Sequence, residues 1–460
     1  MAYGSPYLET DDEFEKLLIR MNPPRVTVDN TSNVNATLVK VDSVNKHGIL
    51  LEVVQVLMDL NLTIKRAYIS SDGEWFMDVF YVVDRYGEKL SDNDVIHRIQ
   101  QTLEAREFIL RSLRRSVGVQ ADTKHTSFEL TGRDRPGLIS EIFAILTDLK
   151  CNVVASEIWT HNSRMAAVVY ITDEITGLPI VDNSDRLNKI KQLLKYVLKG
   201  DRDKRDARTA LSVDSTHTER RLHQMMYADR DYDRDVESSD GGDGRSEKPV
   251  VSVENYADKG YSVVNVKCKD RPKLLFDTVC TLTDMQYVVF HATVNSETPV
   301  AYQEYYIKHL DGCPVSSEGE RLRIIHCLEA AINRRSYNGI RLELCAEDRV
   351  GLLSDAMRIF REHGLTVTQA EVTTRGTQAM NVFYVADASG NPVESCTIEA
   401  VRRAIGKTIL HVKEEFYPRV DSPSSSTNDV AAAAGGGRFS LGTLFRTRSE
   451  KFLYNLGLIR

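Results

Sequence analysis

Four stretches of the chain carry the same pattern of residues. Segments 48–69, 137–158, 273–294 and 351–372, each of 22 residues, align with one another without a gap. Internal repetition constrains a fold more than any single motif, because every copy must form the same small unit. The sequence therefore predicts one module used four times, with a function that a small module can perform.

Each copy sits in the same succession of elements. An alternating or apolar strand precedes a polar loop that reads NKHG, DRPG, DRPK or DRVG. The spacing of Leu138, Ile142, Ile145 and Leu149 then indicates an amphipathic helix, and the Asp or Asn that opens each loop is its expected cap. After a second strand comes a third, rich in β-branched and aromatic residues, at 78–84, 167–173, 304–311 and 381–387.

A second helix completes the pattern, for example at 187–198 or 398–405, and a last strand is expected at 117–120, 209–213 and 409–413. Repeat 3 leaves no room for such a strand before repeat 4. The order βαββαβ is that of the ferredoxin-like unit. We therefore expect an α+β protein of tandem ferredoxin-like modules with antiparallel sheets. Modules this small are marginal alone, so they are expected to pair side by side.

The repeats divide the chain into modules and connectors. The expected parts are an N-terminal lead at 1–34, repeats at 35–120, 125–215, 260–338 and 339–415, a charged linker at 216–258, and a flexible linker with a basic and apolar tail at 416–460. Residues 219–230 of the charged linker are compatible with a short helix. Two interpretations of this segment stay open, a solvated connector and an element that docks. The tail is open to docking on the body or to binding a partner or an anionic surface.

Composition narrows the class of protein. The 460 residues carry a net charge of −7, which argues against a nucleic-acid binder. The seven cysteines are scattered without paired spacing, as expected of reduced thiols in the cytoplasm or nucleus. The acidic N-terminal residues do not resemble a secretory signal or a transit peptide, and no apolar run is long enough to span a membrane.

Signatures of catalysis are absent from the sequence. It has no GxSxG, Walker A or HExxH motif, so we expect no enzyme, no cofactor and no metal site. RNA-recognition modules share the βαββαβ order, and Trp75, Phe76, Phe80 and Tyr81 place aromatic residues on the third strand. That strand lacks the basic and glycine residues of such modules. Core packing is therefore the expected role of these side chains, and nucleic acid is not an expected partner.

The apolar strand followed by DRPGL at 134–138 and an amphipathic helix, in a βαββαβ frame, resembles the ACT domain. Four such modules, split two and two by a charged linker with ERRLHQMMYADR at 219–230 and followed by a tail at 438–460, resemble the plant ACT-domain-repeat family, often called ACR proteins. The resemblance covers nearly the whole chain. It implies regulatory binding of a small ligand, usually an amino acid, at the seam between modules that pair through their sheets.

The corner between the first strand and the first helix suits a free amino acid. Backbone N–H groups and the positive helix end attract a carboxylate there. Glycine at positions 48, 137 and 351 allows close approach, and Asp134 or Asp348 can accept the ammonium group. A tight turn with Asp as helix cap explains the same letters without any ligand, and this alternative stays open.

Serine-sensing ACT domains resemble repeat 2 most closely, and their two Asn positions correspond to Asp134 and Asn152 here. The second of these positions holds Thr63 and Thr366 in repeats 1 and 4. Lys273 replaces glycine in repeat 3, which we expect to be the poorest site. The candidate ligand-binding residues are Asn45, Gly48, Asp134, Arg135, Pro136, Gly137, Leu138, Asn152, Asp348, Gly351 and Leu352.

The sequence thus predicts a non-enzymatic regulatory protein that binds an amino acid or a similar small metabolite. Binding at a seam is expected to change the arrangement of the modules, which an unknown protein partner then reads. Homo-oligomerisation is compatible with these modules. The alternative is a ligand-free interaction scaffold built of ACT folds.

Overall fold

The structure is a computed structural model, and it describes residues 25–72, 75–104, 125–180, 184–199, 208–211, 217–233, 248–335, 339–389, 392–406 and 409–413. The strand expected at 117–120, residues 234–247 of the charged linker and the C-terminal tail lie outside these ranges.

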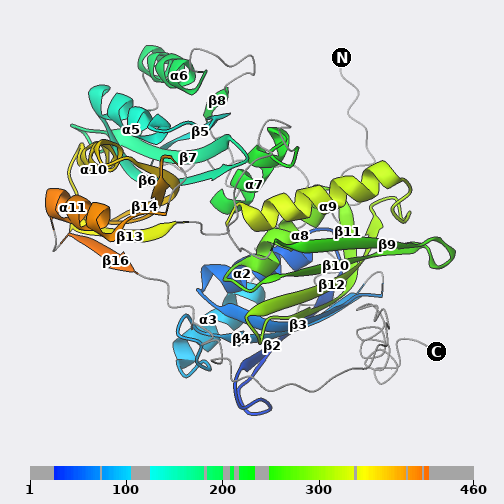
Figure 1. Cartoon of the computed structure of the whole chain (residues 1–460). Helices are drawn as coiled ribbons and strands as arrows, with labels where there is room; N and C mark the ends of the chain where they lie inside the picture. Colours follow the sequence, from blue (N-terminus) through cyan, green and yellow to red (C-terminus); the bar gives the residue numbers. More distant parts are fainter. Residues whose placement is uncertain are drawn as a thin grey trace, which may run out of the picture. The chain divides into compact units, whose positions relative to one another are not determined.

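The described strands form two eight-stranded antiparallel sheets, each shared by two repeats that are not neighbours in the sequence (Figure 1). The sheet of repeats 1 and 3 runs in the order β1 (Arg25–Asp29), β2 (Thr37–Val44), β4 (Trp75–Val83), β3 (Thr63–Ser70), β11 (Tyr287–Asn295), β12 (Val300–His309), β10 (Tyr261–Lys269) and β9 (Val250–Tyr256). The sheet of repeats 2 and 4 runs β16 (Leu410–Lys413), β13 (Ile340–Glu347), β15 (Gln378–Asp387), β14 (Leu365–Arg375), β6 (Cys151–His161), β7 (Arg164–Asp173), β5 (Thr126–Arg133) and β8 (Arg208–Leu211).

The seam of each sheet is a ladder between the second strands of two repeats. β3 pairs with β11, where Ala67 lies opposite Val294, and β6 pairs with β14, where Ile158 lies opposite Ala370. Backbone hydrogen bonds across the seam turn two four-stranded units into one sheet. The expected side-by-side pairing of ferredoxin-like modules is confirmed, and partners alternate along the chain.

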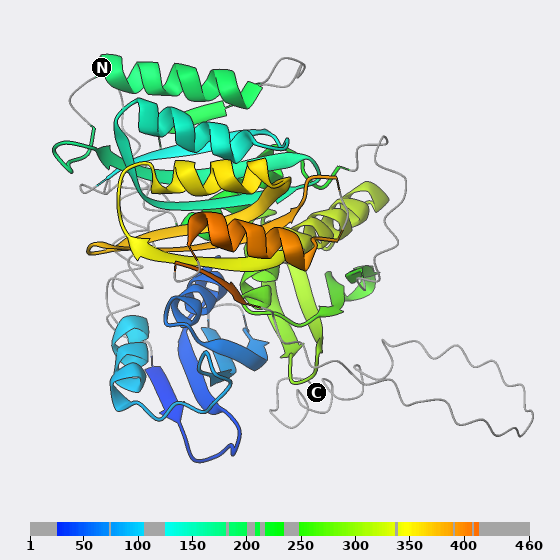
Figure 2. The same cartoon turned by 60° about the vertical axis from the view of Figure 1, so that its left-hand side comes forward.

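Each sheet carries helices on one face. They are α2 (Ile49–Asp59), α3 (Asn93–Glu104), α8 (Leu274–Asp284) and α9 (Glu318–Asn333) on the first sheet, and α5 (Leu138–Asp148), α6 (Ser184–Lys199), α10 (Leu352–Glu362) and α11 (Ser395–Ile405) on the second. Figure 2 shows the second set in a row, with α5 and α10 at its centre. Each set closes a continuous apolar core against its sheet. No helix in the described ranges is both long and apolar enough to cross a membrane.

The aromatic residues of β4 divide between the two faces of the first sheet. Phe76 and Phe80 point into the core, where they are 3% and 0% exposed. Trp75 and Tyr81 alternate with them and lie on the open face, because successive side chains of a strand point to opposite sides. The core-packing prediction is thus confirmed for Phe76 and Phe80 and wrong for the other two.

The outer strands come from different places in different repeats. Repeats 2 and 4 end as expected with β8 and β16, which pair with β5 and β13. In repeats 1 and 3 that position is taken by β1 and β9, which precede the first strand of their repeat and pair with β2 and β10. Residues 25–29 and 250–256 therefore belong to the sheets, although the sequence placed them in the polar lead and the charged linker. Val26 in β1 and Val251 and Val253 in β9 are buried. By pairing with β2 and β10, these two strands cover an edge of each repeat that would otherwise be left unpaired.

Helix α7 (Thr218–Ala228), inside the predicted charged linker, packs on the modules. Leu222 is fully buried against Trp159 on the open face of the second sheet. On its other side α7 reaches repeat 3, where the Nε2 atom of His223 lies 2.8 Å from Oδ1 of Asp277 in α8. The docking interpretation of this helix is correct, and the interpretation as a solvated connector is wrong.

Buried charges hold α7 in this position. The Glu219 carboxylate pairs with Lys273 at 2.5 Å and also with Arg335, while Asp231, just after α7, pairs with Arg334 at 2.6 Å. Arg334 holds the pKa of Asp231 well below its usual range against the opposing effect of burial. A buried charge that loses its partner is costly, so these pairs disfavour separation of α7 from α8 and α9.

Replacing Leu222 with Ala should lower the free energy of unfolding by about 2–4 kcal/mol, because it leaves a cavity under α7. Urea unfolding followed by tryptophan fluorescence measures this, since Trp159 packs directly on the helix. Arg230→Ala, at a largely exposed position, is the matched control and should change stability by less than about 0.5 kcal/mol. Equal effects of the two changes would contradict the docked position of α7.

Candidate functional site

Among the described residues, three recesses lie at the seams between paired repeats. Each is named here for the repeat that supplies its strand–helix corner. The empty space at the repeat 2, repeat 4 and repeat 3 recesses is about 290, 280 and 380 Å³ with open solvent included, and the cavity proper is about 20, 20 and 30 Å³. In every case the corner of one repeat faces the end of the first helix and the start of the second strand of its partner. Antiparallel pairing across the seam produces this arrangement, because it brings the two corners to symmetric positions.

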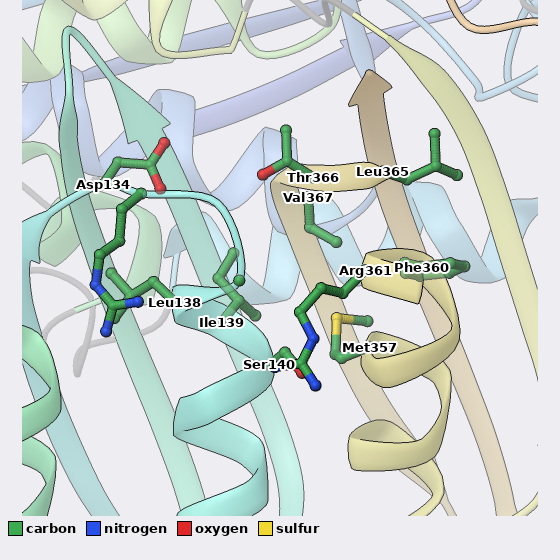
Figure 3. Close-up of a pocket in the computed structure, with 12 residues that line it drawn as sticks. Asp134, Leu138, Ile139, Ser140, Met357, Phe360, Arg361, Leu365, Thr366 and Val367 are labelled. Carbon is green, nitrogen blue, oxygen red and sulfur yellow. The ribbon is translucent and has the colours of Figure 1, made fainter. Parts of the chain in front are cut away.

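The repeat 2 recess combines polar and apolar walls (Figure 3). Figure 3 shows Asp134 on one rim and Thr366 on the other, with Arg361 directed toward Ser140 at the start of α5. Its lining residues are Asp134, Arg135, Gly137, Leu138, Ile139 and Ser140 from repeat 2, and Met357, Phe360, Arg361, Leu365, Thr366 and Val367 from repeat 4.

The start of α5 has no side-chain cap. Gly137 occupies the N-cap position in a left-handed conformation with φ 86°, and intrahelical bonding begins with the N–H of Glu141 donating to the Gly137 carbonyl at 3.1 Å. Asp134 accepts instead from the N–H of Arg135, so its predicted role as a helix cap is wrong. The N–H groups of Ile139 and Ser140 therefore have no intrahelical acceptor, and they lie at the recess. A helix start in this state attracts an anion.

Asp134 is half-buried on the rim, and burial raises the pKa of its carboxyl to about 6. Ionisation of this group at neutral pH therefore costs folding free energy. Retained groups of this kind are typical of binding sites, where a ligand supplies the missing opposite charge. A primary ammonium fits this position by charge and by hydrogen bonding.

The two arginines of this recess differ in their partners. Arg135 donates two hydrogen bonds to the Glu141 carboxylate, at 2.9 and 2.5 Å. Equivalent pairs join Arg271 to Asp277 and Arg349 to Asp355 in repeats 3 and 4. The loop arginine therefore connects the corner to the first turns of its helix.

Arg361, at the end of α10, was not anticipated from the sequence. Its side chain is exposed, and in addition to the hydrogen bonds from Arg135 its positive charge helps to lower the pKa of the Glu141 carboxyl in α5. The Cδ atom of Arg361 comes within 3.3 Å of where a Cβ on Gly137 would stand, so it covers the corner directly. Arg361 belongs to repeat 4 but lies at the corner of repeat 2, so the motif of a single repeat does not indicate it.

Asn152 does not share a recess with Asp134, although the sequence placed them in one site. It lines the repeat 4 recess together with Asp348, Gly351 and Leu352. The start of β6 meets the corner of repeat 4, and the start of β14, with Thr366, meets the corner of repeat 2. The two halves of the expected motif are exchanged because the second strands run antiparallel across the seam.

The repeat 3 corner keeps the same backbone with a different charge. Lys273 adopts the left-handed conformation of the glycines, with φ 66°, which is costly for a residue with a Cβ. Its ammonium is engaged by Glu219 of α7. The ion pair of Lys273 with Glu219 of α7 therefore sets this recess apart from the other two.

Three candidate residues lie elsewhere. Pro136 is exposed and lines none of the three recesses, and the same holds for Asn45 and Gly48 of repeat 1. Within the described ranges, no group of three or more His, Cys, Asp or Glu side chains is arranged to hold a metal ion.

Asp134→Asn should stabilise the protein by about 1 kcal/mol at pH 7.5, because it removes the cost of a partly buried carboxylate. A carboxyl whose pKa is raised on folding gains stability as the pH falls through its folded value. The advantage of the variant should therefore fade below pH 6 and vanish near pH 4. Thermal unfolding across this range measures it, with exposed Asp258→Asn as the control. An advantage that persists unchanged at pH 4 would show that the carboxyl is not perturbed.

Comparison with known proteins agrees with this architecture. The profile of the ACR family N-terminal ACT domain matches residues 32–109, and that of the ACT domain matches residues 126–194 and 340–394. A stretch of 81 residues, 18% of this chain, is 36% identical to 9% of the bifunctional uridylyltransferase/uridylyl-removing enzyme of Azospirillum brasilense.

Two relatives from Arabidopsis thaliana match over nearly their whole length. The ACT domain-containing protein ACR4 is 54% identical over 456 residues, which cover 98% of both chains. The ACT domain-containing protein ACR5 is 53% identical over 459 residues, which cover 98% of this chain and 97% of that one. The chain therefore belongs to the ACR family of ACT domain-containing proteins.

Proposed function

We propose that this protein is a non-enzymatic sensor that binds a free amino acid in the repeat 2 recess and, with other contacts, in the repeat 4 recess. ACT domains are a regulatory, ligand-sensing type of domain. The observation that carries the proposal is the uncapped start of α5 beside Asp134 at a seam. One end of the recess favours a carboxylate and the other an ammonium group.

In the proposed pose the ligand carboxylate accepts from the N–H groups of Ile139 and Ser140, with Arg361 adding positive charge. The ammonium group pairs with Asp134. Met357 and Val367 then form an apolar wall for the ligand side chain. The repeat 4 recess presents Asn152 and Thr147 instead, which favours a more polar side chain there.

A ligand in this position touches both partners of the seam. It therefore stabilises the arrangement in which corner and partner strand are closest, provided that its affinity differs between arrangements. Helix α7 packs on β6 and β7 of repeat 2 and on α8 of repeat 3, so it is placed to pass a change in one sheet to the other. A partner protein that reads this change completes the proposed function.

The second candidate is a ligand-free scaffold, and two observations favour it. The loop arginines are satisfied within the chain, and Lys273 is paired with Glu219. Internal partners of this kind are what a corner without a ligand requires. The two candidate functions differ in whether an amino acid binds at the uncapped N–H groups of Ile139 and Ser140 and at the Asp134 carboxylate.

A thermal-shift screen of the twenty amino acids against the full chain separates the candidates. A ligand at 100 times its dissociation constant should add about 2.7 kcal/mol of stability. Gly137→Val should abolish the shift, because its Cβ would meet Arg361 and close the corner. Gly48→Val is the matched control, since it has the same φ but nothing within 4 Å of the added Cβ. If no amino acid raises the transition, the scaffold is the better description.

Affinity for the amino acid should rise with pH through about 6, because only the ionised Asp134 carboxylate pairs with an ammonium group. Isothermal titration at pH 5, 6 and 7.5 measures this dependence. Asp134→Asn should bind more weakly at pH 7.5 and show no such dependence. A wild-type affinity that is equal at pH 5 and 7.5 would place the ammonium group elsewhere.

A further inference from the structure

The open face of the second sheet shows how a sheet of this protein holds a helix. Trp159 and Val168 pack on Leu222 of α7, and the Tyr170 hydroxyl lies 2.9 Å from Oγ1 of Thr218 at the start of that helix. A salt bridge of 2.7 Å, from Glu129 on the sheet to Arg221 on the helix, sets the charge pattern. At this position the sheet carries an acidic side chain, Glu129, and the helix carries a basic one, Arg221.

The matching face of repeat 1 has no described helix on it. Helices α2, α3, α8 and α9 all belong to the core on the other side of the first sheet. The third strands of the two repeats, DVFYVVD and AVVYITD, align without a gap, so Val79 and Tyr81 stand where Val168 and Tyr170 stand in repeat 2. Met77, one step earlier on the same face, is 41% exposed.

At one position of this face the charge is the reverse of that in repeat 2. Lys40 is opposite Val79 in the ladder of β2 and β4, just as Glu129 is opposite Val168 in that of β5 and β7. Cross-strand partners lie on the same face, so exposed Lys40 takes the position of the acid that meets Arg221.

Aromatic and cationic side chains extend this face onto β3. Tyr68 is opposite Val79, and its ring packs edge-on against Tyr81 at 6.2 Å between centroids. The guanidinium of Arg66 lies 5.7 Å from the centroid of the Tyr81 ring, while its salt bridge to Glu297 leaves it partly exposed. Asp42 contributes a negative charge here and accepts the indole N–H of Trp75.

We propose that Lys40, Arg66, Tyr68, Met77, Val79 and Tyr81, termed here the repeat 1 platform, bind an acidic amphipathic helix of a partner protein. The helix lies on repeat 1 as α7 lies on repeat 2, with apolar residues on Val79 and Met77 and a carboxylate at Lys40. Exposed Met77 and the half-buried Val79, Tyr68 and Tyr81 supply the apolar contact. Lys40 selects the sign of the partner's charge. The platform is separate from the recesses, so its test does not depend on ligand binding.

The probe is a fluorescent peptide of residues 217–231 of this chain, acetylated and amidated, that carries Arg220→Glu and Arg221→Glu. The unaltered peptide is its matched partner. Anisotropy titration of the full chain should show binding of the acidic peptide about tenfold tighter than that of the unaltered one. Lys40→Glu, which gives repeat 1 the charge of repeat 2, should reverse this preference.

Tyr81→Ala should weaken binding of the acidic peptide by about tenfold. Two control changes should leave binding of the acidic peptide unchanged. They are Tyr86→Ala, at a turn residue that is 71% exposed, and Lys189→Glu, at an exposed position of α6. Only variants whose unfolding temperature equals that of the wild type are compared, so that loss of binding is not due to unfolding. Equal binding of both peptides, or binding that survives Lys40→Glu and Tyr81→Ala, would overturn the proposal. So would salt-sensitive binding of a single-stranded RNA 12-mer that is lost in these two variants, because it would identify the face as a base-stacking platform.

Discussion

Edge-to-edge pairing of second strands is the interaction on which the rest of this structure depends. The ladders β3–β11 and β6–β14 satisfy backbone groups that each four-stranded unit alone would leave at an edge. They also bring the corner of one repeat against the strand start of another. Without these ladders the recesses would lack Thr366, Arg361 and Asn152, which come from the partner repeat.

The corner itself combines two costs that a simple turn does not require. A left-handed residue at the N-cap leaves the first N–H groups of α5 uncapped, and Asp134 keeps a carboxyl whose charged form is disfavoured by burial. Repeat 3 adopts the same backbone with Lys273, which supplies an internal ammonium for Glu219. One backbone geometry thus serves as an open corner in repeat 2 and as an anchor for α7 in repeat 3.

Helix α7 contacts both the second sheet and the helices of the first sheet. Its apolar side rests on Trp159, and its charged side ends in the buried pairs of Glu219 and Asp231. Buried ion pairs specify one docked position, because any shift leaves a charge without its partner.

The sequence by itself determined the βαββα part that the four repeats share, since strand alternation, helix periodicity and four in-phase copies all require it. It also located the corners, because the glycines at 137 and 351 mark a backbone that few other residues adopt. Only the tertiary structure decided which repeats pair, that β1 and β9 close repeats 1 and 3, and that Asn152 faces Asp348 rather than Asp134. Those outcomes depend on hydrogen bonds and contacts between residues far apart in the chain, and local periodicity carries no information about which distant edge a strand will meet.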